Sequence, residues 1–313
     1  MGKIKTLFKL IKNDPKKINQ AIMTTWANSP ISHLVPDKVF LRMQYRAVFG
    51  KKLNLKEPKT FNEKLQWLKL YDRNPEYCRL VDKYEVKKLI SDTLGEEYII
   101  PTLGVWDSFD DIDFDSLPDR FVLKCTHDSG SVVLCRDKAT FDVASARAKL
   151  TKKLNSNLFW HGREWPYKDL KPRIIAEQFM ECDSGEELID YKFFCFGGTP
   201  EFVYVSQGLS NHATAHLSYV TLDWEAAPFY RSDFPVFDQL PDKPQTFDQM
   251  LAFSRQLAKD YPFVRVDFYE INGKLYFGEL TFYPGAGFTP FYPEEWNLIW
   301  GEKLPLPETG ASK

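Results

Sequence analysis

The apolar residues of this chain change their spacing near residue 95, and that change limits the folds open to it. Before this point they recur every three or four positions, as Val39, Met43 and Ala47 do, which is the period of an α-helix. After it they alternate with polar residues or form short runs, as in β-strands. The predicted strands cover residues 98–103, 121–125, 131–135, 173–179, 191–196, 201–206, 217–222, 262–271 and 274–281. The chain is therefore predicted to be an α+β protein with a helical N-terminal region.

Capping signals mark where the predicted helices begin. Thr60 and Glu63 form a capping box, as do Asp82 and Glu85, so a helix should open at each. Within the strand-rich part, helices are predicted over residues 140–155 and 247–259. Thr246 is expected to cap the second of these. In the N-terminal region, a helix should begin at Pro36 and stop at Gly50, with an apolar stripe of Val39, Phe40, Met43 and Ala47.

Composition excludes several classes of protein. The 313 residues carry a net charge of −2, so no basic excess points to nucleic acid. The five cysteines lack the spacing of a zinc site or a disulfide framework and are expected to be reduced. No stretch is apolar enough to span a membrane and no signal peptide opens the chain, so we expect a cytoplasmic protein.

The two ends of the chain need separate interpretations. Residues 3–17 carry six lysines against one acid, and their apolar side chains fall roughly on one helical face. Such a basic amphipathic helix suits either peripheral contact with the inner face of a membrane or docking on the body of the protein. Residues 306–310 resemble a sortase motif, but only three residues follow them. We therefore interpret residues 308–313 as a tag-like tail with no part in the function.

The first motif that carries chemistry is a strand with a lysine, followed by a turn of small residues. Lys124 lies in the segment 121–125, and the turn contains Ser129, Gly130 and Ser131. Small residues let the backbone approach phosphate oxygens, and a nearby lysine supplies a point charge. The motif is not a P-loop, because GxxxxGK[ST] is absent. Taken alone, it fits a plain hairpin with a solvent-facing lysine better.

A second motif pairs acidic residues on two neighbouring strands. Arg265 and Asp267 share one face of their strand, Glu279 and Thr281 share a face of the next, and a turn signal at residues 272–273 joins them. Two facing carboxylates repel unless a cation lies between them, and hard oxygen ligands suit Mg²⁺. The alternative is a surface hairpin with ordinary exposed acids.

The register of this hairpin decides between the two interpretations. A two-residue turn at 272–273 would pair Asp267 with Gly278 and direct Glu279 to the opposite face. Facing carboxylates need one extra residue, either in a three-residue loop over 272–274 or in a β-bulge. We therefore predict such an irregularity, with Asp267 opposite Glu279 and Arg265 on the same face.

A third motif is an apolar strand that breaks into an acidic loop. The strand carries Glu177 and ends near Phe179 and Met180, and Asp190 and Lys192 follow in the next strand. Backbone hydrogen-bonding groups and apolar walls at such a place suit a flat purine. A buried strand followed by a polar loop explains the same pattern without a ligand.

Together, in this order, the motifs resemble the ATP-grasp superfamily, and most closely its TupA-like family of teichuronopeptide and surface-polysaccharide biosynthesis. The resemblance runs from about Thr60 to Pro307, and its most specific parts are residues 121–130 and 278–285. It implies two α+β subdomains that sandwich ATP. The implied division is a helical region over 1–75, a small subdomain with the phosphate loop over 76–180, and a large subdomain with the metal site over 181–307.

The resemblance also implies roles for individual residues. Lys83 and Lys124 would bind the ATP phosphates, and Ser129, Gly130 and Ser131 would form the loop that covers them. Glu177, Phe179 and Met180 would form the adenine-binding hinge, and Asp190 would bind the ribose. Mg²⁺ would be held by Asp267, Glu279 and Thr281, and the transferred phosphoryl group would face Lys192 and Arg265. Thr281 stands where most ATP-grasp enzymes have asparagine, which leaves the number of metal ions open.

The chemistry implied for such a protein is ligation with ATP and Mg²⁺. A substrate carboxylate attacks the γ-phosphate, and an amine captures the acylphosphate to give an amide. The family's association with bacterial surface polysaccharides suggests a uronic-acid sugar or glycan as the carboxylate and an amino acid as the amine. The alternative is a glycosyltransferase of the same assembly, for which Asp113 and Asp115 fit the bare Asp-x-Asp pattern, although no strand precedes them.

Overall fold

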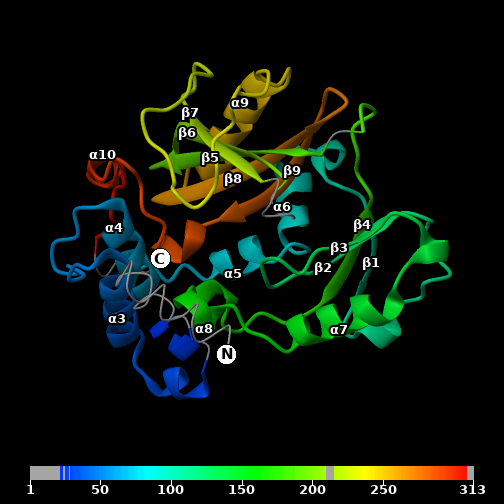
Figure 1. The fold of residues 1–313 in the computed structure, drawn as a ribbon, viewed down its shortest axis with the longest axis horizontal. Helices are drawn as coiled ribbons and strands as arrows, with labels where there is room; N and C mark the ends of the chain where they lie inside the picture. The colour runs from blue at the N-terminus through cyan, green and yellow to red at the C-terminus, as the bar shows by residue number, and fades with distance from the viewer. Residues whose placement is uncertain (1–21, 24, 28, 186, 209–214, 309–313) are drawn as a thin grey trace, which may run out of the picture.

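The computed structural model describes residues 22–308 except 24, 28, 186 and 209–214, and Figure 1 shows its arrangement. The strands of this part are β1 (Thr102–Trp106), β2 (Phe121–Cys125), β3 (Val133–Cys135), β4 (Ile174–Gln178), β5 (Ile189–Phe196), β6 (Thr199–Gln207), β7 (His216–Val220), β8 (Phe263–Ile271) and β9 (Lys274–Thr281). They form an N-terminal sheet of order β1-β4-β2-β3 and a C-terminal sheet of order β7-β6-β5-β8-β9. Neighbouring strands in both sheets are antiparallel.

Helices surround both sheets. They are α3 (Asp37–Phe49), α4 (Phe61–Tyr71), α5 (Glu76–Val81), α6 (Val86–Thr93), α7 (Val143–Leu154), α8 (Phe159–Gly162), α9 (Phe247–Ala258) and α10 (Glu295–Lys303). The argument below also uses the short 3₁₀ helices η1 (Pro30–Leu34), η5 (Trp165–Tyr167) and η6 (Pro284–Gly287). In Figure 1, α7 lies beside the N-terminal sheet and α9 beside the C-terminal sheet, with α5 and α6 between the two sheets. The predicted α+β class is confirmed.

Each predicted strand overlaps an observed one, but the first is displaced. It was expected over residues 98–103, whereas β1 covers Thr102–Trp106 and residues Glu96–Tyr98 form a 3₁₀ turn. This turn follows Gly95, whose φ of 122° takes the chain out of α6. β1 then pairs with β4 through an irregular register between Thr102 and Gly104. The apolar run of residues 98–100 is used for packing rather than for the sheet.

The N-terminal capping box is complete and the second is half formed. Thr60 Oγ1 accepts from the Glu63 N–H at 3.3 Å, and Glu63 Oε2 accepts from the Thr60 N–H at 3.1 Å. Asp82 accepts two N–H bonds from the turn that leads into α6. The Glu85 side chain does not return to Asp82 but accepts a hydrogen bond from Arg173 at 2.8 Å. The distant arginine replaces the local partner.

One local prediction is wrong, and another is correct only in part. Thr246 precedes α9 but does not cap it, because its N–H and its hydroxyl both donate to the Glu270 carboxylate at 2.7 Å. In α3, Phe40 of the predicted stripe is buried, whereas Val39 and Met43 are exposed. The buried face of α3 carries Leu41 and Tyr45 beside Phe40. That face offers more aromatic area to the core, so it is the face that packs.

The C-terminal sheet has a different cover on each of its faces. On one face of β5, Phe193 packs against α9, and on the other face Phe196 packs against Phe61 of α4. The second face changes character along the strand, since Asp190 and Lys192 precede the aromatic residues. Helices therefore close one half of this face, and the polar half faces the N-terminal sheet across a cavity.

Some predictions about the ends of the chain concern residues outside the described part. Segment 3–17 and residues 309–313 lie there, so the amphipathic helix and the tag-like tail stay predictions, as do the subdomain boundaries. None of the helices in the described ranges is long and apolar enough to cross a membrane. The described cysteines form no disulfide, as expected.

A buried lysine joins the N-terminal helices to the segment that follows β9. Lys69 of α4 is 1% exposed, and its ammonium donates to the carbonyls of Gly162 and Ala286 at 2.6 Å and to Gln66 Oε1 at 2.9 Å. Burial lowers the pKa of Lys69 to about 7, and the nearby Glu164 carboxyl opposes that shift. Because Ala286 belongs to η6, Lys69 fixes the end of β9 against α4.

This arrangement predicts a large stability effect for Lys69→Met. The substitution leaves the Gly162 carbonyl and the Gln66 Oε1 oxygen without a donor, at about 1–3 kcal/mol each, and should lower the melting temperature by roughly 5–10 °C. The Ala286 carbonyl keeps a hydrogen bond from Gln66 Nε2 at 3.3 Å. Lys88→Met is the matched control, because Lys88 is 74% exposed and its ion pair with Asp92 lies on the surface. Scanning calorimetry of both variants checks the prediction, and equal melting temperatures would contradict it.

Candidate active site

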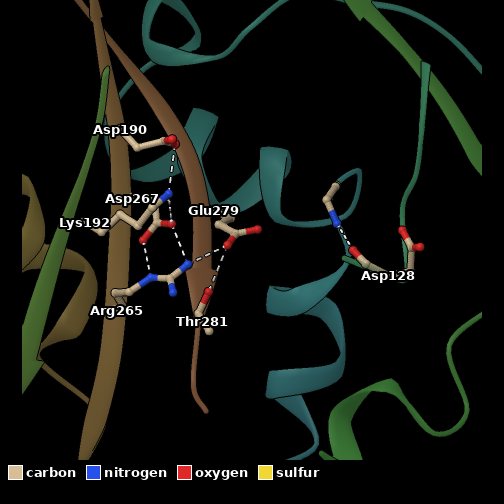
Figure 2. A network of polar contacts seen from close by, with 8 residues as sticks. Asp128, Asp190, Lys192, Arg265, Asp267, Glu279 and Thr281 are labelled. Carbon is tan, nitrogen blue, oxygen red and sulfur yellow. Dashed lines mark hydrogen bonds and ion pairs between the residues drawn. The ribbon is translucent and has the colours of Figure 1, made fainter. Parts of the chain in front are cut away.

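A row of charged side chains crosses three neighbouring strands of the C-terminal sheet. Lys192 of β5 pairs with Asp267 of β8, and Asp267 pairs with Glu279 of β9. Directly paired residues point to the same face of a sheet, so the three side chains lie side by side. Figure 2 shows them together with Asp190 and Arg265. These five residues are called the carboxylate wall below.

One extra residue in β9 creates this row. Ile271 pairs with Lys274 across a two-residue turn, so the three-residue loop is not formed. Phe268 then pairs with Phe277 while Asp267 pairs with Glu279, which leaves Gly278 as the bulged residue. The predicted irregularity is therefore present, in its bulge form. A Cβ at position 278 would lie 3.1 Å from the Asp267 carbonyl oxygen, which explains the glycine.

Arg265 is the cation between the two facing carboxylates. Its Nε and Nη2 donate to Asp267 Oδ1 at 2.7 Å and Oδ2 at 2.6 Å, and Nη2 also donates to Glu279 Oε1 at 2.7 Å. The Thr281 hydroxyl donates to the same Glu279 oxygen at 3.1 Å. Lys192 donates to Asp190 at 2.9 Å and to Asp267 at 3.2 Å (Figure 2). Bidentate charge-assisted bonds of this kind fix the geometry of the wall.

The neighbouring charges outweigh burial at some groups of the wall but not at Asp267, whose pKa is raised by burial although Arg265 and Lys192 oppose the shift. Burial raises the pKa of Glu279, but Arg265 and Lys83 lead the cations that lower it to about 2. Burial opposes the charge on Lys192, but Asp190 and Asp267 raise its pKa above the usual value. By count the wall holds three carboxylates and two cations, Lys192 and Arg265, so its acidic side chains outnumber its basic ones.

Lysines dominate the opposite side of the cavity. Lys124 of β2 and Lys87 of α6 both bind Glu177 of β4, each at 2.7 Å. Burial raises the pKa of Glu177, but the two lysines outweigh this effect and lower it to about 2. Lys83 lies just before α6 and donates to the Asp128 carbonyl oxygen. These four charged residues, Lys83, Lys87, Lys124 and Glu177, are called the lysine wall, and they carry an excess of positive charge.

The two walls, apart from Arg265, line one cavity of about 280 Å³. Lys83, Lys87, Lys124 and Glu177 face it from one side, and from the other side it is faced by Asp190, Lys192, Asp267 and Glu279. The electrostatic influence of Lys83 on Glu279 shows that the walls are close enough to interact. The structure thus brings together the predicted lysines and the predicted carboxylates, which are up to about 200 positions apart in sequence.

A second and larger cavity, of about 690 Å³, adjoins the first. The two share Lys124, Glu177 and Asp190 in their linings. The end of β4 lines the larger cavity through Gln178, Phe179, Met180 and Glu181, and apolar side chains line it at Val122, Val132 and Leu134. Its size falls in the range of small-molecule and cofactor sites. The predicted hinge therefore borders a cavity of suitable size and lining.

The small-residue turn between β2 and β3 only partly reaches the cavity. Ser129 and Gly130 line it, and a Cβ at position 130 would meet no atom within 4 Å. Ser131 is 2% exposed, and its hydroxyl donates to Asp128 Oδ1 at 2.6 Å while accepting from the Cys125 N–H at 2.7 Å. The Ser131 side chain thus holds the turn rather than facing the cavity.

Phe179 has a second environment besides the cavity. Its ring lies 4.4 Å from the guanidinium carbon of Arg120 and 5.3 Å from that of Arg136. Arg120 also pairs with Glu181, so the hinge residues are held on their outer side by cation–π and ionic contacts. Phe179 contributes to the hinge by this packing as well as by its backbone.

Sequence reasoning missed several residues of the site. Lys87 binds Glu177 and lines the smaller cavity, and Tyr269, Gln178 and Glu187 line the cavities as well. The signal for Lys87 was its spacing of four from Lys83, which places both at the start of one helix. The signal for Tyr269 was its alternation with Arg265 and Asp267 in β8. For Glu187 the sequence offered no pattern.

The carboxylate wall fits a magnesium ion by its chemistry. Arg265 and Thr281 both bind Oε1 of Glu279, and the other oxygen points away from them in Figure 2. The Glu279 side chain is 42% exposed, whereas the Asp267 side chain is 2% exposed and both of its oxygens accept hydrogen bonds. Within the described ranges no cluster of three or more His, Cys, Asp and Glu residues is arranged for a metal. One or two carboxylates suit Mg²⁺, which takes its other ligands from water and phosphates.

Comparison with known proteins gives a family match and several distant structural likenesses. The profile of the family described as TupA-like ATPgrasp matches residues 63–305. No curated protein matches the chain. Similar solved structures include a D-alanine–D-alanine ligase from Bacillus anthracis complexed with ATP, with 17% identity over 65% of this chain and 55% of that chain and a TM-score of 0.37. The corresponding ligase from Helicobacter pylori has 15% identity, coverage of 72% and 61%, and a TM-score of 0.38.

A third likeness is the ATP-grasp ligase PsnB complexed with a phosphomimetic variant of its minimal precursor, Mg and ADP. It has 10% identity over 85% of this chain and 70% of that chain, with a TM-score of 0.39. The chain spans 55% and 61% of the length of the two D-alanine–D-alanine ligases. Likenesses at these identities and TM-scores carry no information on activity, whereas the family profile covers well over half of the 313 residues. The chain therefore belongs to the TupA-like ATP-grasp family.

Proposed function

We propose that this protein is an ATP- and Mg²⁺-dependent ligase that joins a carboxylate to an amine and releases ADP. The observation that carries the proposal is the pair of oppositely charged walls on one cavity. The lysine wall has more cations than acids, and the carboxylate wall has more acids than cations. A nucleotide triphosphate with its metal ion has the complementary charges, because its phosphates are anionic and its metal is cationic.

Different residues would have different roles in such a reaction. Lys83, Lys87 and Lys124 would neutralise the phosphates, and the backbone of residues 178–180 would bind the adenine in the larger cavity. Glu279, supported by Asp267, would hold Mg²⁺, which when bound would offset the phosphate charge. Transfer of the γ-phosphoryl group to the substrate carboxylate releases ADP, and displacement of phosphate by the amine then forms the amide. Lys192 and Arg265 would stabilise the charge on the transferred group.

The substrates are a narrower part of the proposal. The association of the family with surface-polysaccharide assembly supports a uronic-acid carboxylate and an amino acid as the amine. The competing function is a glycosyltransferase or other transferase of the same assembly. Its Asp-x-Asp motif gains no support, because Asp113 accepts a local hydrogen bond from the Asp115 N–H in an exposed turn. The family match favours the ligase.

The outer face of α3 supports a membrane contact in addition to segment 3–17. On this face Val39 and Met43 are each 45% exposed, and nearby in η1 Leu34 is 85% and Ile31 66% exposed. Cations alternate with them on the same face, namely Lys38, Arg42 and Arg46. Exposed apolar side chains among cations suit the interface of an anionic bilayer. We propose that the protein contacts the inner face of the membrane through this surface, with residues 3–17 adding to the attraction.

The nucleotide proposal predicts a loss of ligand-induced stabilisation in Lys124→Ala. Wild-type protein should gain about 2.7 kcal/mol of stability at an ATP·Mg²⁺ concentration of one hundred times Kd, seen as a higher melting temperature. The variant should lose most of that gain, because Glu177 would keep only Lys87 and the phosphates would lose a cation. Lys171→Ala is the control, since Lys171 is 65% exposed in a surface ion pair. Equal stabilisation of wild type and Lys124→Ala would contradict the site.

The membrane proposal predicts salt-sensitive binding to vesicles of phosphatidylglycerol and phosphatidylcholine. Wild-type protein should co-sediment at low salt and dissociate as salt rises, because screening weakens the attraction. Leu34→Asp combined with Val39→Asp should weaken binding, and Leu298→Asp, at a side chain 43% exposed on α10, should not. Absence of co-sedimentation at low salt would overturn the proposal.

A further inference from the structure

The row of paired residues in the C-terminal sheet continues beyond the carboxylate wall. Lys192 pairs with Tyr204 of β6, and Tyr204 pairs with Tyr219 of β7. Both tyrosines are nearly buried, at 5% and 3% exposure, and their rings are 5.7 Å apart. The face that carries the charged site therefore extends into an aromatic floor two strands wide, on the side away from Glu279.

Arg231 lies beside this floor. Its guanidinium carbon is 5.8 Å from the centre of the Tyr204 ring and 5.6 Å from that of Phe234. The ammonium of Lys192 is also 5.8 Å from the centre of the Tyr204 ring. Arg231 and Lys192 thus lie near the same aromatic ring, although Arg231 comes from the irregular segment between β7 and α9.

The backbone next to Arg231 is fixed to a distant part of the chain. Tyr230 and Tyr292 exchange two backbone hydrogen bonds, at 2.8 and 2.9 Å, and their rings stack with centres 5.8 Å apart. A side chain on such an anchored segment has a defined position. The 18% exposure of Arg231 leaves its head partly open to solvent.

The partner of Arg231 differs from the partners of the other cations on this face. Arg231 donates to both oxygens of Asp233, at 2.9 and 2.5 Å. Asp233 is 53% exposed, whereas Asp267, the partner of Lys192 and Arg265, is 2% exposed. A half-exposed carboxylate two residues away in sequence contributes little to stability and can be replaced by another carboxylate. The guanidinium of Arg231 therefore already makes the two-bond contact that binds a carboxylate, and its present partner is easily exchanged.

We propose that Arg231 binds the α-carboxylate of the amino-acid substrate, an inference that rests on the ligase function proposed above. An arginine fork occupies both carboxylate oxygens, so the carboxylate it holds is one that does not react. In the proposed reaction the sugar carboxylate is phosphorylated, and the amino acid brings the carboxylate that remains. Held at Arg231, beside Lys192, the amino acid would present its amine toward the transferred group. Asp233 occupies the fork until the substrate enters.

The test is saturation-transfer NMR on the full chain with a non-hydrolysable ATP analogue, Mg²⁺ and the twenty amino acids in small pools. At least one amino acid should bind wild-type protein, and its carboxamide should not. Arg231→Gln should weaken that binding about tenfold or more, because a charge-assisted bidentate contact is lost. Asp233→Ala should strengthen it about two- to fivefold, because a competing carboxylate is removed. Arg231→Lys should fall between wild type and Arg231→Gln.

The controls separate this inference from the ligase proposal. Arg255→Gln, on α9, should bind the amino acid as wild type does, and ATP-induced stabilisation of all variants should stay unchanged. Three results would overturn the inference and leave the ligase proposal intact. They are retained ATP binding with no amino-acid binding, equal binding of the carboxamide, and equal weakening by Arg231→Gln and Asp233→Ala. Arg231-dependent binding of uronate oligomers in place of amino acids would also overturn it. Loss of ATP binding in the wild type would overturn the ligase proposal instead.

Discussion

Two carboxylates on neighbouring strands share one face of a sheet only where a cation lies between them, and here that cation is Arg265. Its guanidinium binds both oxygens of Asp267 and one of Glu279. The facing arrangement itself depends on a single bulged glycine, Gly278, which shifts the register of β9 by one residue. Without that residue Glu279 would point to the α9 side of the sheet. The acidic half of the site therefore depends on this bulge and on Arg265, which offsets the repulsion between the two carboxylates.

The two walls of the cavity have opposite excesses of charged side chains, and one ligand can explain both. The lysine wall belongs to β2, β4 and the start of α6, and the carboxylate wall belongs to β5, β8 and β9. Each wall pairs most of its charges internally, through Glu177 on one side and Arg265 on the other, yet each keeps an excess of one sign. A ligand with anionic phosphates and a divalent cation would satisfy both excesses at once. This complementarity is the physical basis of the ligase proposal.

Alternation and turn chemistry allowed much of this structure to be predicted from the sequence. The strands follow from period two, and one extra residue, in a longer loop or as a bulge, follows from requiring Asp267 to face Glu279. The choice of the bulge could be made only from the structure. The error at the start of α9 is caused by a partner distant in sequence, because Glu270 takes the hydroxyl of Thr246. A local partner, Asp128, takes the hydroxyl of Ser131. Local spacing also cannot show which apolar face of a helix meets the core, so the exposure of Val39 was not foreseen.

The most direct test of this account is a crystal structure with a non-hydrolysable ATP analogue and Mn²⁺, located by its anomalous scattering. The account predicts the metal against Glu279, the phosphates between Lys124 and Arg265, and the adenine beside the backbone of residues 178–180. A nucleotide bound elsewhere would contradict it. So would a metal peak with no contact to Glu279, because the carboxylate wall would then have another role.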